Sequence, residues 1–178
     1  NRTYDSNNSD SLSQMGYGQA YNGYSYIVKN KEDVQVKMLD GKTYLYSKET
    51  SGEYVNNIKS TYKLEYINDH YELYNTEERY IYDRYGYISK IIDKNNNETT
   101  YIYNNRILDK IILSDNKEIK FNYNEESLIT SIELANGKTI SYKYDENLNL
   151  IQFIDEANYV VTYNYDDNHN VVSWYNKN

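Results

Sequence analysis

Apolar and polar residues alternate along most of this chain, and a period of two predicts half-buried β-strands. In the segment 119–123, isoleucine, phenylalanine and tyrosine take every second position, with lysine and asparagine between them. The segments 140–144 and 161–165 alternate in the same way. Since neighbouring strand residues point to opposite faces, each segment places its aromatic side chains on one face. Because no segment carries an amphipathic helical stripe, the sequence predicts an all-β fold with almost no helix.

A phrase of two aromatic residues separated by one residue, followed by Asp or Asn, recurs along the second half of the chain. Its copies begin at residues 80, 101, 121, 142 and 163, so they lie 20 or 21 residues apart. The aromatic residues of the phrase are Tyr80, Tyr82, Tyr101, Tyr103, Phe121, Tyr123, Tyr142, Tyr144, Tyr163 and Tyr165. Self-similarity at such a short period indicates a repeat architecture. We expect the second aromatic residues of successive copies to lie in register on one face.

Each repeat reads as two antiparallel strands joined by turns. The residues that open the first turn are Asp83, Asn104, Asn124, Asp145 and Asp166. Their short side chains can accept a hydrogen bond from the backbone two residues on, which starts a turn. The one shorter interval, between residues 101 and 121, is expected to reflect a deletion in a turn.

The strand that follows the turn is also expected to alternate. In the third repeat, the residues expected to share one face are Leu128, Thr130, Ile132 and Leu134. A second turn then leads back, and Asn136-Gly137 is the strongest hairpin signal of the chain. An isolated hairpin is marginal in water, which explains why the unit has to recur.

The first 79 residues show the same character with less regularity. We expect hairpins at 34–46, turning at Asp40-Gly41, and at 62–74, turning at Asn68-Asp69. The segment 47–61 is expected to be a longer loop, and residues 1–15 to be a loose lead-in or an edge strand.

Two continuous regions are predicted: 1–79, with degenerate repeats that lead into the array, and 80–178, with the five repeats. The chain starts at Asn1 rather than Met and ends within the pattern, so we expect it to be a fragment of a longer protein.

The composition narrows the classes of function. The chain has 178 residues, 25 tyrosines, no proline, no cysteine and a net charge of −8. A negative charge disfavours nucleic acid and anionic membranes, because both bind basic surfaces. No apolar stretch approaches the ~20 residues of a membrane span, and no signal peptide is visible. The lack of cysteine suits an extracellular protein of a Gram-positive bacterium.

The Tyr-x-Tyr-Asp phrase with its period near 21 resembles the YD repeat of the RHS family, most closely over residues 80–104. Residues 16–28 look like the region that precedes the first repeats in that family. The family includes bacterial wall-associated proteins, polymorphic toxins, shell components of Tc toxins, and teneurins. The resemblance implies consecutive antiparallel β-hairpins forming a spiralling YD-repeat sheet, a segment of a β-shell that can enclose a C-terminal effector. Self-cleavage in the family uses a proline-flanked Asp motif, which this chain lacks.

The glycine of the family's turn is kept only at Gly86. The corresponding residues of the third to fifth repeats are Ser127, Leu148 and His169. If this position needs a positive φ, Leu148 is strained by about 1–2 kcal/mol.

We expect no catalytic residue, no metal site and no cofactor, and therefore no enzyme. His70 and His169 are the only histidines, and no nucleophile motif accompanies them. The segment 93–98 has oxygens at alternate positions, as calcium loops do, but it lacks the central glycine, so a solvated turn is favoured. The adjacent acidic pairs at 77–78 and 125–126 do not suit glycosidase chemistry, since neighbouring strand residues point apart.

The repeated tyrosines allow two readings: they pack the sheet, or they form a surface on which sugars stack. Choline- and glucan-binding repeats rank second as a family, because the chain has a single tryptophan, Trp174, and no Gly-Trp. We expect a non-catalytic structural segment of a large secreted or cell-surface bacterial protein, with a carbohydrate-binding adhesin module as the alternative. The expected partners are the rest of the same polypeptide (further repeats and an enclosed effector), a cell-surface glycan, and other copies through sheet edges.

Overall fold

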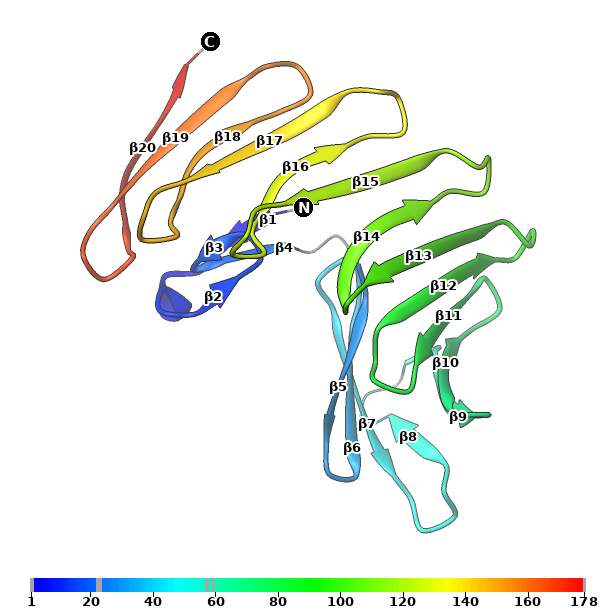
Figure 1. The fold of residues 1–178 in the computed structure, drawn as a ribbon. Coiled ribbons are helices and arrows are strands. Elements are labelled where there is room, and N and C mark those ends of the chain that lie inside the picture. Colours follow the sequence, from blue (N-terminus) through cyan, green and yellow to red (C-terminus); the bar gives the residue numbers. More distant parts are fainter. Residues whose placement is uncertain (1, 22–23, 57, 59, 178) are drawn as a thin grey trace. The chain divides into compact units, whose positions relative to one another are not determined.

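The computed structural model describes residues 2–21, 24–56, 58 and 60–177, most of which lie in β-strands or in the turns between them (Figure 1). A 16-stranded sheet contains β5 to β20 in chain order, and consecutive strands pair antiparallel, as β11 with β12 and β17 with β18 do. The sheet is open, with β5 and β20 at its edges. The predicted all-β fold of consecutive antiparallel hairpins is confirmed, and no α-helix occurs in the described part of the chain.

Before the repeats, the strands of the sheet are β5 (Tyr26–Asn30), β6 (Asp33–Lys37), β7 (Thr43–Lys48), β8 (Tyr54–Asn56), β9 (Lys63–Ile67) and β10 (His70–Tyr74). The repeats contribute β11 (Glu78–Asp83), β12 (Ile88–Asp93), β13 (Glu98–Asn104), β14 (Ile107–Ile112), β15 (Glu118–Tyr123), β16 (Ile129–Glu133), β17 (Thr139–Tyr144), β18 (Leu150–Ile154), β19 (Val160–Tyr165) and β20 (Val171–Lys177).

The start of the chain forms two small sheets of its own. Their strands are β1 (Arg2–Tyr4) paired with β4 (Gln19–Tyr21), and β2 (Leu12–Ser13) paired with β3 (Gly16–Tyr17), with a 3-10 turn at Ser6–Asn8. The expected loop at 47–61 is wrong in part, because it contains β8, which pairs with β7. Residues 57 and 59 of that loop, residue 1 of the lead-in and residues 22–23 of the segment 16–28 lie outside the described residues.

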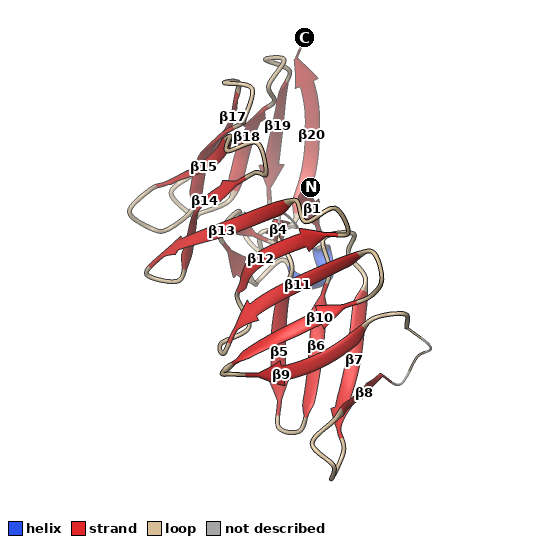
Figure 2. Cartoon of the chain, turned by 90° about the vertical axis from the view of Figure 1, so that its right-hand side faces the viewer, coloured by secondary structure: helices blue, strands red, loops and turns tan. Residues whose placement is uncertain are grey.

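The chain divides into two compact units, each with its own core. The first comprises residues 1–21, 104–110 and 117–178, and the second comprises 22–103 and 111–116. The fully buried side chains include Met15, Leu108, Leu128, Ile129 and Leu150 in the first unit, and Tyr46, Leu73, Tyr82 and Ile88 in the second. In the second unit, β9 to β12 lie side by side (Figure 2). The division predicted at residue 79 stays a prediction.

The turns follow one pattern, which the fourth repeat shows in full. Asp145 Oδ1 accepts hydrogen bonds from the amides of Asn147 at 3.0 Å and Asn149 at 2.8 Å. The amide of Leu148 donates to the carbonyl of Asp145 at 3.1 Å. The carboxylates that accept two backbone amides in the same way belong to Asp83, Asp93, Asp155 and Asp166. Asn124 accepts the amide of Leu128 without a charge, so the turn depends on the side-chain oxygen and not on its charge.

The turn does require a left-handed residue. The φ angles at this position are 96° at Gly86, 62° at Ser127, 63° at Leu148 and 62° at His169. The strain expected at Leu148 therefore applies, at about 1–2 kcal/mol. In the second repeat, the shorter turn consists of Asn105 and Arg106, which both have positive φ.

A one-residue bulge follows each of these four left-handed turns. In the third repeat, Tyr123 pairs with Ile129 while Asn122 pairs with Ser131, so Thr130 is the extra residue. The expected face for 128–134 is therefore wrong, because the alternation breaks at Thr130, and Leu128 and Ile129 are both buried. The register shifts in the same way at Tyr82, Tyr144 and Tyr165.

Replacing Asp145 by Ala removes the acceptor of two backbone amides. We expect the free energy of unfolding to fall by about 1–2 kcal/mol, since one hydrogen bond contributes about 0.5–1.5 kcal/mol. Asp145→Asn keeps the oxygen, as Asn124 does, and should lose less than half as much. Urea denaturation measures both, and an Asn variant as unstable as the Ala variant would contradict this account of the turn.

Candidate functional site

The repeated aromatic side chains lie mostly inside the protein. The buried ones are Tyr80, Tyr82, Tyr101, Phe121 and Tyr142. The half-buried ones are Tyr103, Tyr123, Tyr144, Tyr163 and Tyr165. The strand registers place these side chains on one face within each unit, as the alternation predicts. Little ring surface is therefore open for a ligand to stack on.

The hydroxyl of the second aromatic residue links one repeat to the repeat before it. Each of these hydroxyls donates to the carbonyl of the residue fifteen positions earlier: Tyr123 to Leu108 at 2.7 Å, Tyr144 to Ile129 at 2.7 Å and Tyr165 to Leu150 at 2.9 Å. Ile129 and Leu150 are themselves the strand partners of Tyr123 and Tyr144. The hydroxyls therefore form a regular ladder of cross-links along the third, fourth and fifth repeats.

The first two repeats depart from this ladder. The hydroxyl of Tyr82 bonds to the hydroxyl of Ser25 at 2.7 Å, and Ser25 donates to the carbonyl of Lys37 at 2.6 Å. The hydroxyl of Tyr103 is buried without a hydrogen-bond partner among the described residues, and its ring contacts Tyr87 edge-on, with 5.4 Å between the ring centroids.

Burial raises the pKa of the tyrosines in the phrases of the first two repeats. It raises the pKa of Tyr101 to about 12, and it also raises the pKa values of Tyr80, Tyr82 and Tyr103. These phenols are therefore neutral near pH 7, which suits their use as hydrogen-bond donors inside the sheet.

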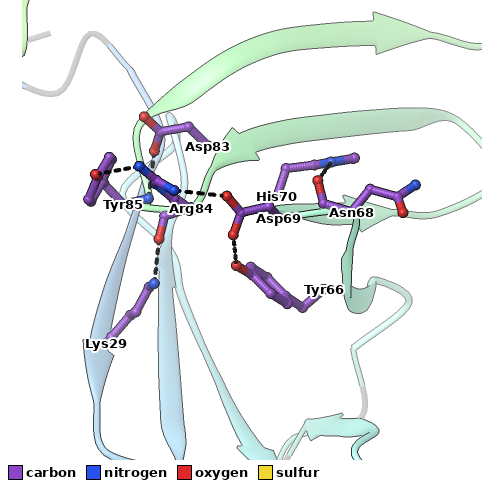
Figure 3. Close-up of polar contacts among 8 residues, drawn as sticks. All are labelled: Lys29, Tyr66, Asn68, Asp69, His70, Asp83, Arg84 and Tyr85. Carbon is purple, nitrogen blue, oxygen red and sulfur yellow. Dashed lines mark hydrogen bonds and ion pairs between the residues drawn. The ribbon is translucent and has the colours of Figure 1, made fainter.

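An exposed polar cluster surrounds the turn of the first repeat (Figure 3). Arg84 donates to the Asp69 carboxylate at 3.2 Å and to the Tyr85 hydroxyl at 2.9 Å, and its guanidinium lies 4.9 Å from the centroid of the Tyr85 ring. Tyr66 donates to the same carboxylate at 2.7 Å, and these contacts lower the pKa of Asp69. The ammonium of Lys29 donates to the carbonyl of Arg84, so β5 joins the cluster.

A shallow pocket of about 230 Å³ lies beside this cluster. Its lining consists of Tyr24, Tyr26, Ile27, Tyr85, Gly86 and Tyr87. Tyr26 is 40% exposed and Tyr85 is 52% exposed, so two of its rings face solvent. This pocket was not predicted from the sequence. Its one local signal was Tyr85, an aromatic residue in a turn where the later repeats carry Glu126, Asn147 and Asn168.

The residues considered for catalysis or metal binding each have hydrogen-bond partners of their own. His70 bonds to the Glu72 carboxylate at 2.9 Å, and His169 bonds to the Asn149 side chain at 2.7 Å. The carboxylate of Asp93 accepts hydrogen bonds from two backbone amides of its own turn. Across the described residues, no group of three His, Cys, Asp or Glu side chains is arranged to hold a metal ion. In the same residues, no helix has the length and apolar character to cross a membrane.

Comparisons with known proteins give a likeness to solved structures but no family. No protein-family model matches the chain, and no curated protein matches it. Among solved structures, the chain is similar to a chain in the Photorhabdus luminescens Tc holotoxin pore, with 16% identity over 84% of this chain and a TM-score of 0.43. The match spans 8% of the length of that chain. The resemblance to YD repeats, drawn from the repeat motif, stays a prediction.

The ladder gives a paired prediction. Tyr144→Phe removes a hydroxyl that donates to a carbonyl, so we expect unfolding free energy to fall by about 1 kcal/mol. Tyr103→Phe removes a buried hydroxyl without a partner among the described residues, so it should leave stability unchanged or raise it. Denaturation of both variants measures the difference. Equal losses would contradict the ladder.

The alkaline pH dependence follows from Tyr101. The pKa of Tyr101 is about 12 in the folded chain and 10.0 in the unfolded chain. Its contribution to the free energy of unfolding is therefore complete below pH 10 and is lost as the pH rises toward 12. At pH 12 we expect this one group to have lost about 2 kcal/mol. Between pH 10 and 12, the free energy of unfolding of Tyr101→Phe should fall by correspondingly less than that of the unmodified chain. Identical pH profiles of the two chains would contradict the raised pKa of Tyr101.

Proposed function

We propose that this chain is a non-catalytic structural segment of a large secreted or cell-surface bacterial protein of the toxin or wall-associated type. The observation that carries the proposal is the hydroxyl ladder of the third to fifth repeats. It uses the repeated aromatic side chains to join one repeat to the next, which is the use that a scaffold requires.

The proposed role within the parent protein is part of a spiralling β-shell that encloses or displays an effector. The repeat motif supports this role through its resemblance to the YD repeats of the RHS family. The partners are then further repeats of the same polypeptide and the effector. The open edges of the sheet support the expected pairing with other strands. At the β20 edge, Val172, Trp174 and Tyr175 are exposed.

A second candidate function is carbohydrate binding, with the site moved from the repeated tyrosines to the pocket at Tyr26 and Tyr85. The specific observation in its favour is a small pocket with two solvent-facing rings, one of which, Tyr85, also contacts Arg84 of the neighbouring polar cluster. A single pocket of this kind differs from the repeated platforms that the adhesin reading expected.

A glycan array with the isolated chain separates the two functions. For a scaffold, we expect no specific binding, and we expect Tyr144→Ala and Tyr123→Ala to lose several kcal/mol of stability because each removes a packed ring and a cross-link. Tyr85→Ala is the matched control, since it removes an exposed ring and should leave stability within about 0.5 kcal/mol. Specific binding that Tyr85→Ala abolishes in a folded chain would favour the carbohydrate-binding function instead.

A further inference from the structure

The first residues of the chain occupy backbone groups that the repeats leave free. At a left-handed turn and its bulge, some carbonyls and amides have no partner within the sheet. In the first unit, the amide of Ile129 donates to the carbonyl of Gln14 at 2.8 Å, and the amide of Tyr17 donates to the carbonyl of Leu148 at 3.4 Å. These contacts fall at the turns of the third and fourth repeats.

In the fifth repeat, a side chain from the start of the chain binds the backbone of the turn. The hydroxyl of Tyr4 donates to the carbonyl of His169 at 3.2 Å and accepts the amide of Val171 at 3.1 Å. The first residues of the chain thus bind the carbonyl of the left-handed residue in the fourth and fifth repeats, and the amide two residues later in the third and fifth.

Side chains add selectivity to these backbone contacts. The ring of Tyr17 stacks on the ring of His169, with 3.8 Å between the centroids. Gln19 donates to the hydroxyl of Tyr165 at 3.2 Å, and Gln19 is 3% exposed. Met15 is fully buried. The contact surface therefore has a stacking position, a polar position and an apolar position.

Gly16 is the tightest point of the contact. Its φ is +91°, and a Cβ atom there would lie 2.6 Å from the carbonyl oxygen of Leu148, a backbone atom. A larger residue cannot enter without moving the turn of the fourth repeat. The site accordingly selects a peptide with a glycine at this position.

The same turn position is used again in the second unit by a different segment. The amide of Ile27 donates to the carbonyl of Gly86 at 2.8 Å, at the turn of the first repeat. Residues 2–21 contribute no strand to the 16-stranded sheet, since β1 to β4 pair only among themselves. The turn of the first repeat therefore accepts a backbone amide from β5, an edge strand of the same sheet, while the turn of the fourth repeat accepts one from a segment outside that sheet.

We propose that the turns of the third, fourth and fifth repeats form a peptide-binding site. Residues 2–21 are its tethered ligand, and the same segment of a second copy can replace them. A tethered ligand competes at an effective concentration in the millimolar range, so the site has to be vacated before a free peptide binds well. Backbone pairing supplies the affinity, and Gly16 with Tyr17 supplies the selectivity.

The test uses the full chain with Gly16→Val, which blocks the tethered segment, and a fluorescent peptide with the natural sequence of residues 2–21. We expect saturable binding to this variant, measured by anisotropy, and at least tenfold weaker binding to the unmodified chain. A peptide that itself carries Gly16→Val should not bind. The matched control chain is Gly137→Val, which has the same left-handed backbone (φ +81°) with nothing within 4 Å, and it should behave like the unmodified chain.

Hydrogen exchange gives a second readout at the site itself. The amides of Ile129 and Val171 should exchange faster in the Gly16→Val chain and regain protection when the peptide is added. Three results would overturn the proposal. They are a folded variant that does not bind the peptide, equal binding by the variant and the unmodified chain, and a variant that no longer folds although Gly137→Val does. The last result would make residues 2–21 an integral part of the fold.

Discussion

The bulge after each left-handed turn determines what the rest of a repeat can do. One extra residue, such as Thr130, ends the regular pairing and lets Leu128 and Ile129 both enter the core. It also leaves backbone groups that the sheet does not use. Tyr144 takes the carbonyl of Ile129, and the start of the chain takes the amide of the same residue. The tyrosine ladder and the contact with the start of the chain thus meet at the bulge of the third repeat.

The tyrosine hydroxyls turn a set of marginal hairpins into a coupled array. Each hairpin could pair with its neighbour through the backbone alone, but a backbone ladder does not by itself fix the register between them. The bond from Tyr165 to Leu150 joins adjacent repeats at a single register, because a slip of one residue would move the ring to the other face. In repeat proteins, stability is approximately a sum over such neighbouring interfaces.

The sequence was sufficient for the strands of the repeats and for the turn at Asp145, since these depend on local alternation and on hydrogen bonds within a few residues. It left the conformation of Leu148 open, because the residue type alone does not show whether the turn keeps a positive φ there. It was not sufficient for the bulge at Thr130, because the alternation of residue types does not mark which position drops out of the ladder. The contact of Gly16 with Leu148 was also beyond it. That contact joins residues far apart in the chain, and only the folded backbone brings them together.

The hydroxyl of Tyr103, which has no hydrogen-bond partner among the described residues, affects how the array responds to force. The carbonyl fifteen residues before it belongs to Ile88, so the missing cross-link is the one between the first and second repeats. The contact between Tyr103 and Tyr87 holds that seam through ring packing, which tolerates sliding better than a directional bond does. We expect this seam to resist bending less than the seams of the third to fifth repeats, because it lacks the directional side-chain bond that each of those has.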